Sequence, residues 1–186
     1  MLQIFYLFPI LLCIAFIISI TQAYTITNSK LTAPKSTAFE EAAFAYSKAL
    51  QNADANAILN AIPPQIISSL MNKKNISKLQ FQQIMKSQIQ RLAENYKIES
   101  IQINQKQKRE GTLDNGIPYF VIPVNFITTT NSGKKRSIQT EVIALLSDNK
   151  WYFIRGNDEA ILNITSDAFP GLEKIKINPQ KITKIM

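Results

Sequence analysis

Apolar residues in the first half of the chain recur at helical spacing. They lie three or four positions apart from Phe39 to Leu50 and again from Phe81 to Leu92, so each run carries one apolar stripe. The second stripe is wide enough to lie on the face of a sheet. A shorter apolar run around Ile58 ends at two consecutive prolines, which cannot continue a helix. The predicted helical segments are residues 37–52, 54–62, 65–71 and 77–95.

Short polar side chains mark where these helices should begin. Thr37 with Glu40, and Ser77 with Gln80, have the spacing of a capping box, in which each side chain accepts a hydrogen bond from the other residue's backbone. Asp54 suits the N-cap of the short middle helix, and this structural role accounts for an acid at that position.

After residue 96 the apolar spacing changes from helical to the alternation that is typical of strands. Asp, Asn and Gly separate the alternating runs, which indicates short turns in an antiparallel meander. The predicted strands are residues 97–104, 117–130, 136–146 and 151–155, with a candidate further strand at residues 172–177. The basic residues after Pro179 are expected to form a loose tail.

The run from Ile117 to Phe126 is apolar on both faces of its strand. The N-terminal helices, including the long helix at residues 77–95, are expected to cover only one of these faces. We expect the segment from Phe169 to Ile177 to cover part of the other face, and a second copy of the chain or another protein to cover the rest. A large apolar side chain stabilises by roughly 1.5–3 kcal/mol when buried, so a water-exposed face would be costly.

Helices followed by strands predict an α+β domain, with N-terminal helices packed on a curved, cone-like antiparallel sheet and a C-terminal extension. The element order over residues 37–155, the run NADANAILNAIPP and the final aromatic strand KWYFIRG resemble the nuclear-transport-factor-two-like superfamily, which includes ketosteroid isomerases and polyketide cyclases. This resemblance implies a cone whose mouth is a pocket. The superfamily includes enzymes with Asp, His or Tyr deep in the cone, and non-catalytic members that bind small ligands or other proteins.

The N-terminal residues have the pattern of an export signal. Residues 4–20 form an unbroken apolar run, which Thr-Gln-Ala follows, so cleavage is expected after Ala23. The alternative is an uncleaved inner-membrane anchor through residues 4–20, although that run is slightly shorter than the ~20 residues of a spanning helix. The expected organisation is a signal peptide at residues 1–23, a linker at 24–35, the cone-like domain at 36–156, and an extension with a basic tail at 157–186.

The composition excludes several chemistries. The chain has no histidine, and its one cysteine, Cys13, lies in the apolar N-terminal run. Thiol catalysis, disulfides and zinc sites built from Cys or His are therefore excluded for the cleaved chain, and we expect neither a metal nor a cofactor. A chain rich in Lys, Ile, Asn and Gln but without disulfides fits a bacterial periplasmic or secreted protein.

The net charge is +8, from 21 Lys and Arg against 13 Asp and Glu, which suggests anionic partners. The two densest basic clusters, residues 106–109 and 134–136, fall in successive turns of the meander and therefore at opposite ends of its strands. They cannot merge into the contiguous basic track that nucleic-acid binding requires, so no nucleic-acid partner is expected.

Two sets of side chains are candidates for a site. Glu141 lies among apolar residues in mid-strand and could act as a general base, or it could be a structural carboxylate on an open sheet face, paired with a cation such as Arg155. The second set would line the cone and bind an apolar ligand with an anionic head, unless its aromatic members simply form core. With Glu141, its members are Tyr46, Tyr119, Asn125, Trp151, Phe153 and Arg155.

The hypothesis that the sequence favours is an exported, non-enzymatic binding or protein-interaction module of the bacterial cell envelope. Its partner would be a second copy of the chain or another envelope protein, with membrane contact only through an uncleaved N-terminal segment. One alternative is a carrier of a small apolar or anionic ligand in the cone pocket. The other is a lyase- or isomerase-type enzyme with Glu141 as general base.

Overall fold

A computed structural model describes residues 33–156, 162 and 165–185, and describes side chains from residue 36 onward. The expected signal run at residues 4–20, the cleavage site at Ala23 and most of the expected linker lie outside these residues. Within the described ranges, no helix is both long and apolar enough to cross a membrane.

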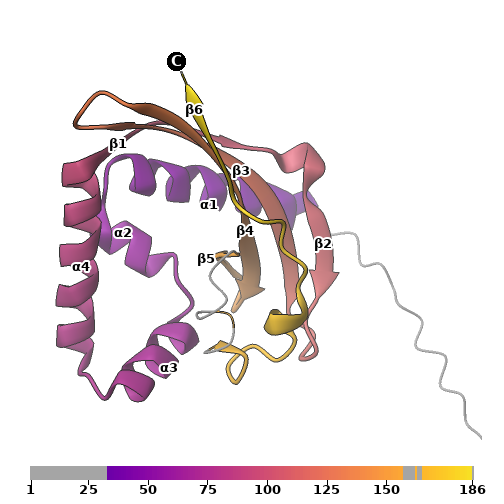
Figure 1. Cartoon of the computed structure of the whole chain (residues 1–186). Helices are drawn as coiled ribbons and strands as arrows, with labels where there is room; N and C mark the ends of the chain where they lie inside the picture. Colours follow the sequence, from indigo (N-terminus) through magenta and orange to yellow (C-terminus); the bar gives the residue numbers. More distant parts are fainter. Residues whose placement is uncertain (1–32, 157–161, 163–164, 186) are drawn as a thin grey trace, which may run out of the picture. The chain divides into compact units, whose positions relative to one another are not determined.

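Helices make up the first half of the described chain (Figure 1). Their bounds are α1 Ala33–Gln51, α2 Ala55–Asn60, α3 Pro64–Lys74 and α4 Lys78–Asn95. These helices agree with the segments that the apolar spacing predicts, with α3 longer than expected. Periodicity therefore identifies where helices form in this chain.

Two of the three predicted helix starts are confirmed. The Asp54 carboxylate accepts hydrogen bonds from two backbone N–H groups in the first turn of α2, at 3.1 and 3.0 Å. Ser77 and Gln80 form the complete capping box of α4. The start expected at Thr37 is wrong, because α1 already begins at Ala33. The first turn of α1 contains a proline, whose missing N–H costs nothing at that position.

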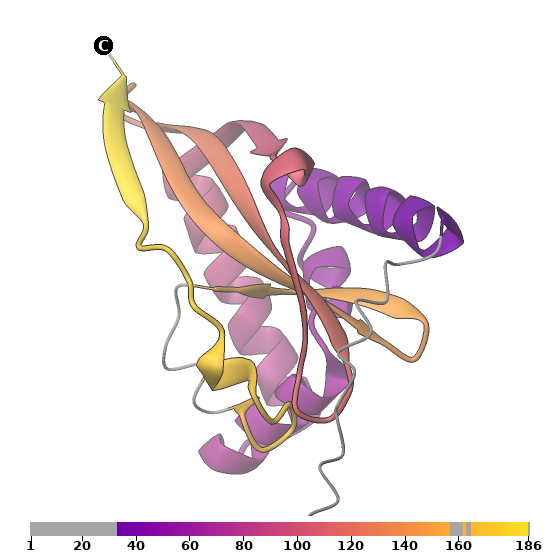
Figure 2. The same cartoon turned by 90° about the vertical axis from the view of Figure 1, so that its right-hand side faces the viewer.

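The strands form one curved antiparallel sheet, which curls as a half-barrel with α1 on its concave side (Figures 1 and 2). The long hairpin of β3 and β4 forms the centre of the sheet. Strands β1 and β2 pair end to end along one edge of β3, and β5 and β6 pair end to end along the far edge of β4. The predicted α+β class is confirmed. The strand bounds are β1 Tyr96–Ile103, β2 Arg109–Thr112, β3 Pro118–Thr130, β4 Lys135–Ser147, β5 Lys150–Arg155 and β6 Lys181–Ile185.

Two short edge strands differ from the prediction. Strand β2 lies where a basic turn was expected, and β6 lies where a loose tail was expected. The strand expected at residues 172–177 is wrong, because a single 3-10 turn, Leu172–Lys174, and irregular chain occupy this region. Neither β2 nor β6 has a buried residue, so neither shows the alternation of apolar and polar residues that reveals a strand in a sequence.

Each face of the sheet has its own apolar cover. On the concave face, the Phe39 ring of α1 contacts Phe120 and Trp151 edge to face, with ring centroids 4.9 and 5.1 Å apart. On the other face, α3 and the chain after β5 cover β3, β4 and β5, so the expectation that helices cover only one face is wrong. The prediction that the segment from Phe169 to Ile177 covers part of that face is confirmed. The buried residues of this second cluster include Ile66, Val121, Ile143, Leu145, Ile154, Phe169, Leu172 and Ile175.

Candidate functional site

The concave face holds a groove between α1 and the sheet. The groove lies where the cone pocket was expected, but its cavity volume is only about 10 Å³, which is close to the minimum for one water molecule. Its walls are almost wholly apolar. The lining residues are Ala43, Tyr46, Ser47, Leu50, Ile101, Ile103, Ile122, Val124, Phe126, Val142 and Phe153.

Two of the predicted pocket residues, Tyr46 and Phe153, face each other in this groove. Their rings stack with centroids 4.6 Å apart and an angle of 4° between the ring planes. Burial raises the pKa of the Tyr46 hydroxyl to about 12, while the positive charge of Arg155 acts in the opposite direction. Tyr46 is therefore a neutral group at physiological pH.

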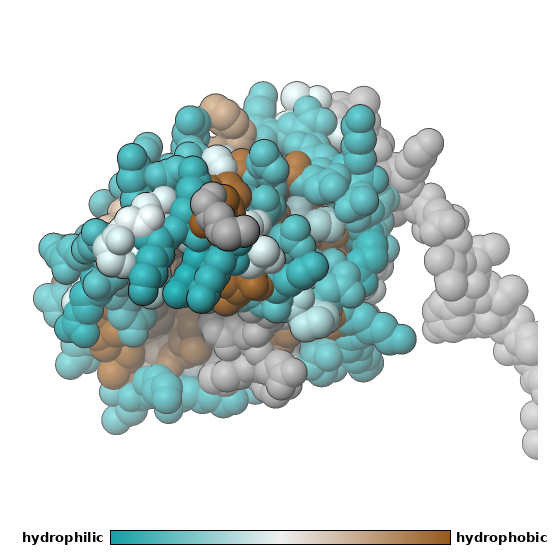
Figure 3. Space-filling view, turned by 45° about the horizontal axis from the view of Figure 1, so that its top comes forward, coloured by the Kyte–Doolittle hydropathy of each residue, from teal (hydrophilic) through white to brown (hydrophobic). Residues whose placement is uncertain are grey.

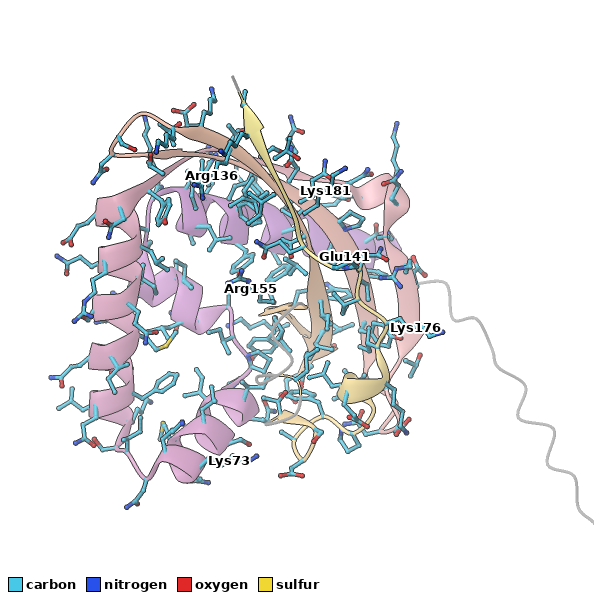
Figure 4. All side chains as sticks on the ribbon, in the orientation of Figure 1. Lys73, Arg136, Glu141, Arg155, Lys176 and Lys181 are labelled. Atoms are coloured by element: carbon cyan, nitrogen blue, oxygen red, sulfur yellow. The ribbon has the colours of Figure 1, made fainter. Side chains whose placement is uncertain are left out.

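Arg155 lies at the end of β5 and points to the helix side of the sheet (Figure 4). It pairs across the ladder with Val142, a lining residue of the groove, so the two side chains share a face. Its Nη2 donates to the Oε1 of Gln180 at 3.1 Å. Arg155 thus links the end of β5 to the residue that precedes β6.

Thr140 contributes an unpaired polar atom to the same face. It is only 8% exposed, and its Oγ1 has no hydrogen-bond partner among the described residues. It lies opposite Val124 in the ladder and two residues before Val142, both of which line the groove. An unpaired buried hydroxyl on this apolar face is unusual, because buried polar groups normally have a hydrogen-bond partner.

Glu141 lies on the opposite face of the sheet and is 4% exposed. Its Oε2 accepts hydrogen bonds from Arg109 Nη2 and from the backbone N–H of Asn178, each at 2.7 Å, and its Oε1 accepts one from the Asn178 side-chain amide at 2.8 Å. The expected open sheet face is therefore wrong, because the chain that follows β5 covers it. The cation is Arg109 rather than Arg155, because Arg155 lies on the other face.

The remaining predicted pocket residues divide between the two faces. Trp151 stacks on Phe120 in the concave core, with ring centroids 5.0 Å apart. Tyr119 packs against the second cluster, and Asn125 accepts a hydrogen bond from Ser137 at 2.7 Å on that same side. The structure thus brings together Tyr46, Trp151, Phe153 and Arg155 on one face, and places Tyr119, Asn125 and Glu141 on the other. The seven residues do not line one common pocket.

Helix α4 differs from what its apolar spacing suggested. Its stripe was expected to cover the sheet, but α4 contacts α2 and the edge strand β1, and α1 lies on the concave face instead. We define the α4 stripe as Phe81, Ile84, Met85, Ile89 and Leu92. Within it Phe81 is 6% exposed, whereas Ile84 is 46% and Leu92 is 61% exposed. Phe81 is packed, Ile84 and Leu92 are open to solvent, and Met85 and Ile89 are half-buried.

Apolar side chains are also exposed on β6, where Ile182 is 54% and Ile185 is 37% exposed. In Figure 3, brown apolar patches interrupt a mostly teal, polar surface on the face shown there. The described residues contain no cluster of three or more acidic, His or Cys side chains that could hold a metal ion. The sequence did not predict that these residues are exposed. Periodicity shows which residues share an apolar face, but it does not show whether another element packs on that face.

No protein-family model matches the chain. No curated protein and no solved structure matches it either.

Proposed function

We propose that this chain is a non-catalytic protein-interaction module that works in the bacterial cell envelope after export. The observation that carries the proposal is the exposure of the α4 stripe. Leu92 lies on the same helical face as Phe81, yet it is 61% exposed while Phe81 is buried. Each large apolar side chain of this kind would contribute roughly 1.5–3 kcal/mol if a partner buried it. Ile84 of the same stripe is 46% exposed, and exposed apolar patches mark interaction sites in many proteins.

The groove supports this proposal over the ligand carrier. Pockets for small molecules usually enclose roughly 300–1,000 Å³, and the cavity between α1 and the sheet measures about 10 Å³. The stacked rings of Tyr46 and Phe153 fill the place that an apolar ligand would take. A carrier would need α1 to move away from the sheet.

The geometry of Glu141 supports the proposal over the enzyme. A general base needs a lone pair within hydrogen-bond reach of the substrate. Both oxygens of Glu141 accept hydrogen bonds from Arg109 or Asn178, and the carboxylate lies on the face away from the groove. The assignment that fits these contacts is a structural one.

Membership of the nuclear-transport-factor-two-like superfamily is part of the proposal. The half-barrel sheet with α1 on its concave side is compatible with the cone of that superfamily. Several of its members act by binding other proteins. Fold alone does not carry function, so the proposal depends on the exposed stripe.

Site-specific photo-crosslinking in the native host tests the proposal. A photoreactive residue at Leu92 or Ile84 should give a discrete protein adduct. The matched control is Gln83, which is exposed on the opposite side of α4 and should give none. An adduct of twice the chain mass would identify a second copy as the partner. Absence of any protein adduct from both stripe positions would overturn the proposal.

A further inference from the structure

We propose that β6 is the docking site for an extended, acidic segment of the partner protein, which adds a strand to the sheet at this edge. This inference rests on the proposed interaction function. Strand addition uses the unpaired backbone N–H and C=O groups of an edge strand, and charged and apolar side chains select the partner.

The first support is that β6 is an available edge. Among the described residues it pairs only with β4, from Gln139–Lys181 to Lys135–Ile185, and all five of its residues are exposed. Figure 2 shows it at the margin of the sheet. An edge strand presents a row of backbone groups that another chain can pair with.

Two other edges of the sheet, those of β5 and β1, are less suitable. The neighbouring strand β5 is covered, because the carbonyl of Ala61 accepts the Phe153 N–H at 2.7 Å. Strand β1 contacts α1 and α4, and its ladder with β3 has a register shift between Ile98 and Ser100. Such irregularities hinder pairing at an edge. The β6 ladder has no register shift.

The second support is charge. Lys181 and Lys184 take part in none of the ion pairs found among the described residues. Lys176 and Lys181 point away from the helices in Figure 4. The adjacent end of β4 adds Arg136 and Lys135, of which only Lys135 has an acidic partner, Glu99, at 3.0 Å. An acidic strand therefore complements this edge.

The same charges disfavour a second copy as the occupant. Antiparallel pairing of two β6 strands about Thr183 would place four lysines in one two-stranded ribbon. Lysines on edge strands are a common means of preventing such self-pairing. A chain of net charge +8 would add long-range repulsion to this local repulsion.

The face of each side chain defines the sequence of the partner strand. Residues directly opposite in a ladder lie on the same face. Lys181 and Ile185 share the outer face with their partners on β4, and Ile182 and Lys184 share the helix side. An antiparallel partner therefore needs the pattern Val-Glu-Thr-Val-Glu, which places acids opposite the two lysines and apolar residues opposite the two isoleucines.

One partner can reach both β6 and the α4 stripe. The turn between β3 and β4 contacts the end of α4, where the backbone N–H of Asn131 donates to the carbonyl of Asn95 at 3.3 Å. The far end of β6 pairs with Lys135, just after that turn. The Leu92 end of the α4 stripe therefore lies on the β3 side of this turn, and β6 lies on its β4 side.

Fluorescence anisotropy with a labelled peptide that contains Val-Glu-Thr-Val-Glu tests the inference. We expect binding that the double charge reversal Lys181→Glu with Lys184→Glu weakens by about tenfold or more. A peptide with both glutamates changed to lysine should bind this variant and not the original chain. The matched control is Lys73→Glu with Lys74→Glu on the exposed end of α3, which changes net charge equally and should leave affinity unchanged.

Amide hydrogen exchange separates strand addition from simple charge attraction. Bound peptide should slow exchange at residues 181–185. The inference is overturned if the peptide does not bind, if the control pair weakens binding as much as the β6 pair, or if exchange at β6 does not change. A concentration-dependent dimer that the β6 charge reversal alters would also overturn it. Crosslinking from Leu92 does not depend on β6, so an adduct there with no peptide binding would leave the proposed function standing.

Discussion

Asn178 binds the carboxylate of Glu141 twice, through its backbone N–H at 2.7 Å and its side-chain amide at 2.8 Å. The pair joins the middle of β4 to the chain that leads into β6. Close by, the backbone N–H of Gly156 donates to the carbonyl of Glu141 at 3.1 Å. A Cβ at Gly156 would lie 2.9 Å from that carbonyl and 3.0 Å from the Ile177 side chain, so the crossing is tight.

Glu141→Gln should lower the free energy of unfolding by about 1–3 kcal/mol, because a neutral amide loses the ion pair with Arg109 and can no longer accept all three hydrogen bonds. Urea denaturation measures this change. Arg109→Gln is the control and should cost less, because the Arg109 side chain is 46% exposed and its loss leaves Asn178 bound to Glu141. Equal stability of Glu141→Gln and the original chain would contradict the structural role.

Stability should fall as pH rises from 10 to 12, in part because of Tyr46. Its folded pKa is raised from 10.0 to about 12, so unfolded chains ionise first and their ionisation favours unfolding. The contribution is fully present below pH 10 and is lost by about pH 12, with a size of at most about 2–3 kcal/mol.

Chemical denaturation at several pH values measures the Tyr46 contribution. Tyr46→Phe should remove that part of the decline and leave the part due to the other tyrosines. Identical pH profiles for the two proteins would show that Tyr46 is not shielded from water.

The two ends of the α4 stripe should respond differently to mutation. Phe81→Ala should destabilise the fold by about 3–4 kcal/mol, because the ring is buried and its loss leaves a cavity. Leu92→Ser should change stability by no more than about 0.5 kcal/mol, because that side chain already lies in water. Thermal unfolding of the two variants provides the measurement, and comparable losses would mean that Leu92 is packed.

Export can be checked directly by intact-mass spectrometry of the protein from its native host. If the signal is cleaved as proposed, the mature chain begins at Tyr24 and its mass lacks residues 1–23. A mass that includes those residues would favour the inner-membrane anchor instead.

Local sequence signals account for much of the fold. The spacing of apolar residues predicts the helices, and the Ser77–Gln80 box and the Asp54 cap predict two of their starts. Strand-like apolar runs between turn residues predict β1, β3, β4 and β5. They do not predict β2 or β6, because β2 has no buried residue and β6 is exposed along its whole length.

Long-range contacts account for what the sequence does not reveal at the site. The partners of Glu141 are 32 and 37 residues away and lie in segments without a periodic pattern. Strand parity places Tyr119 and Asn125 on one face, and Trp151, Phe153 and Arg155 on one face. It does not say that these two faces are on opposite sides of the sheet, because that depends on the ladder register.

The residues that cover the outer face of the sheet are synthesised after the sheet itself, so this face can be fully buried only late in synthesis. Val121 and Ile143 leave the ribosome before Phe169 and Leu172, which shield them. A nascent chain that ends at β5 therefore exposes part of the apolar outer face of its sheet, and this surface makes the incomplete chain prone to aggregation until the later residues emerge.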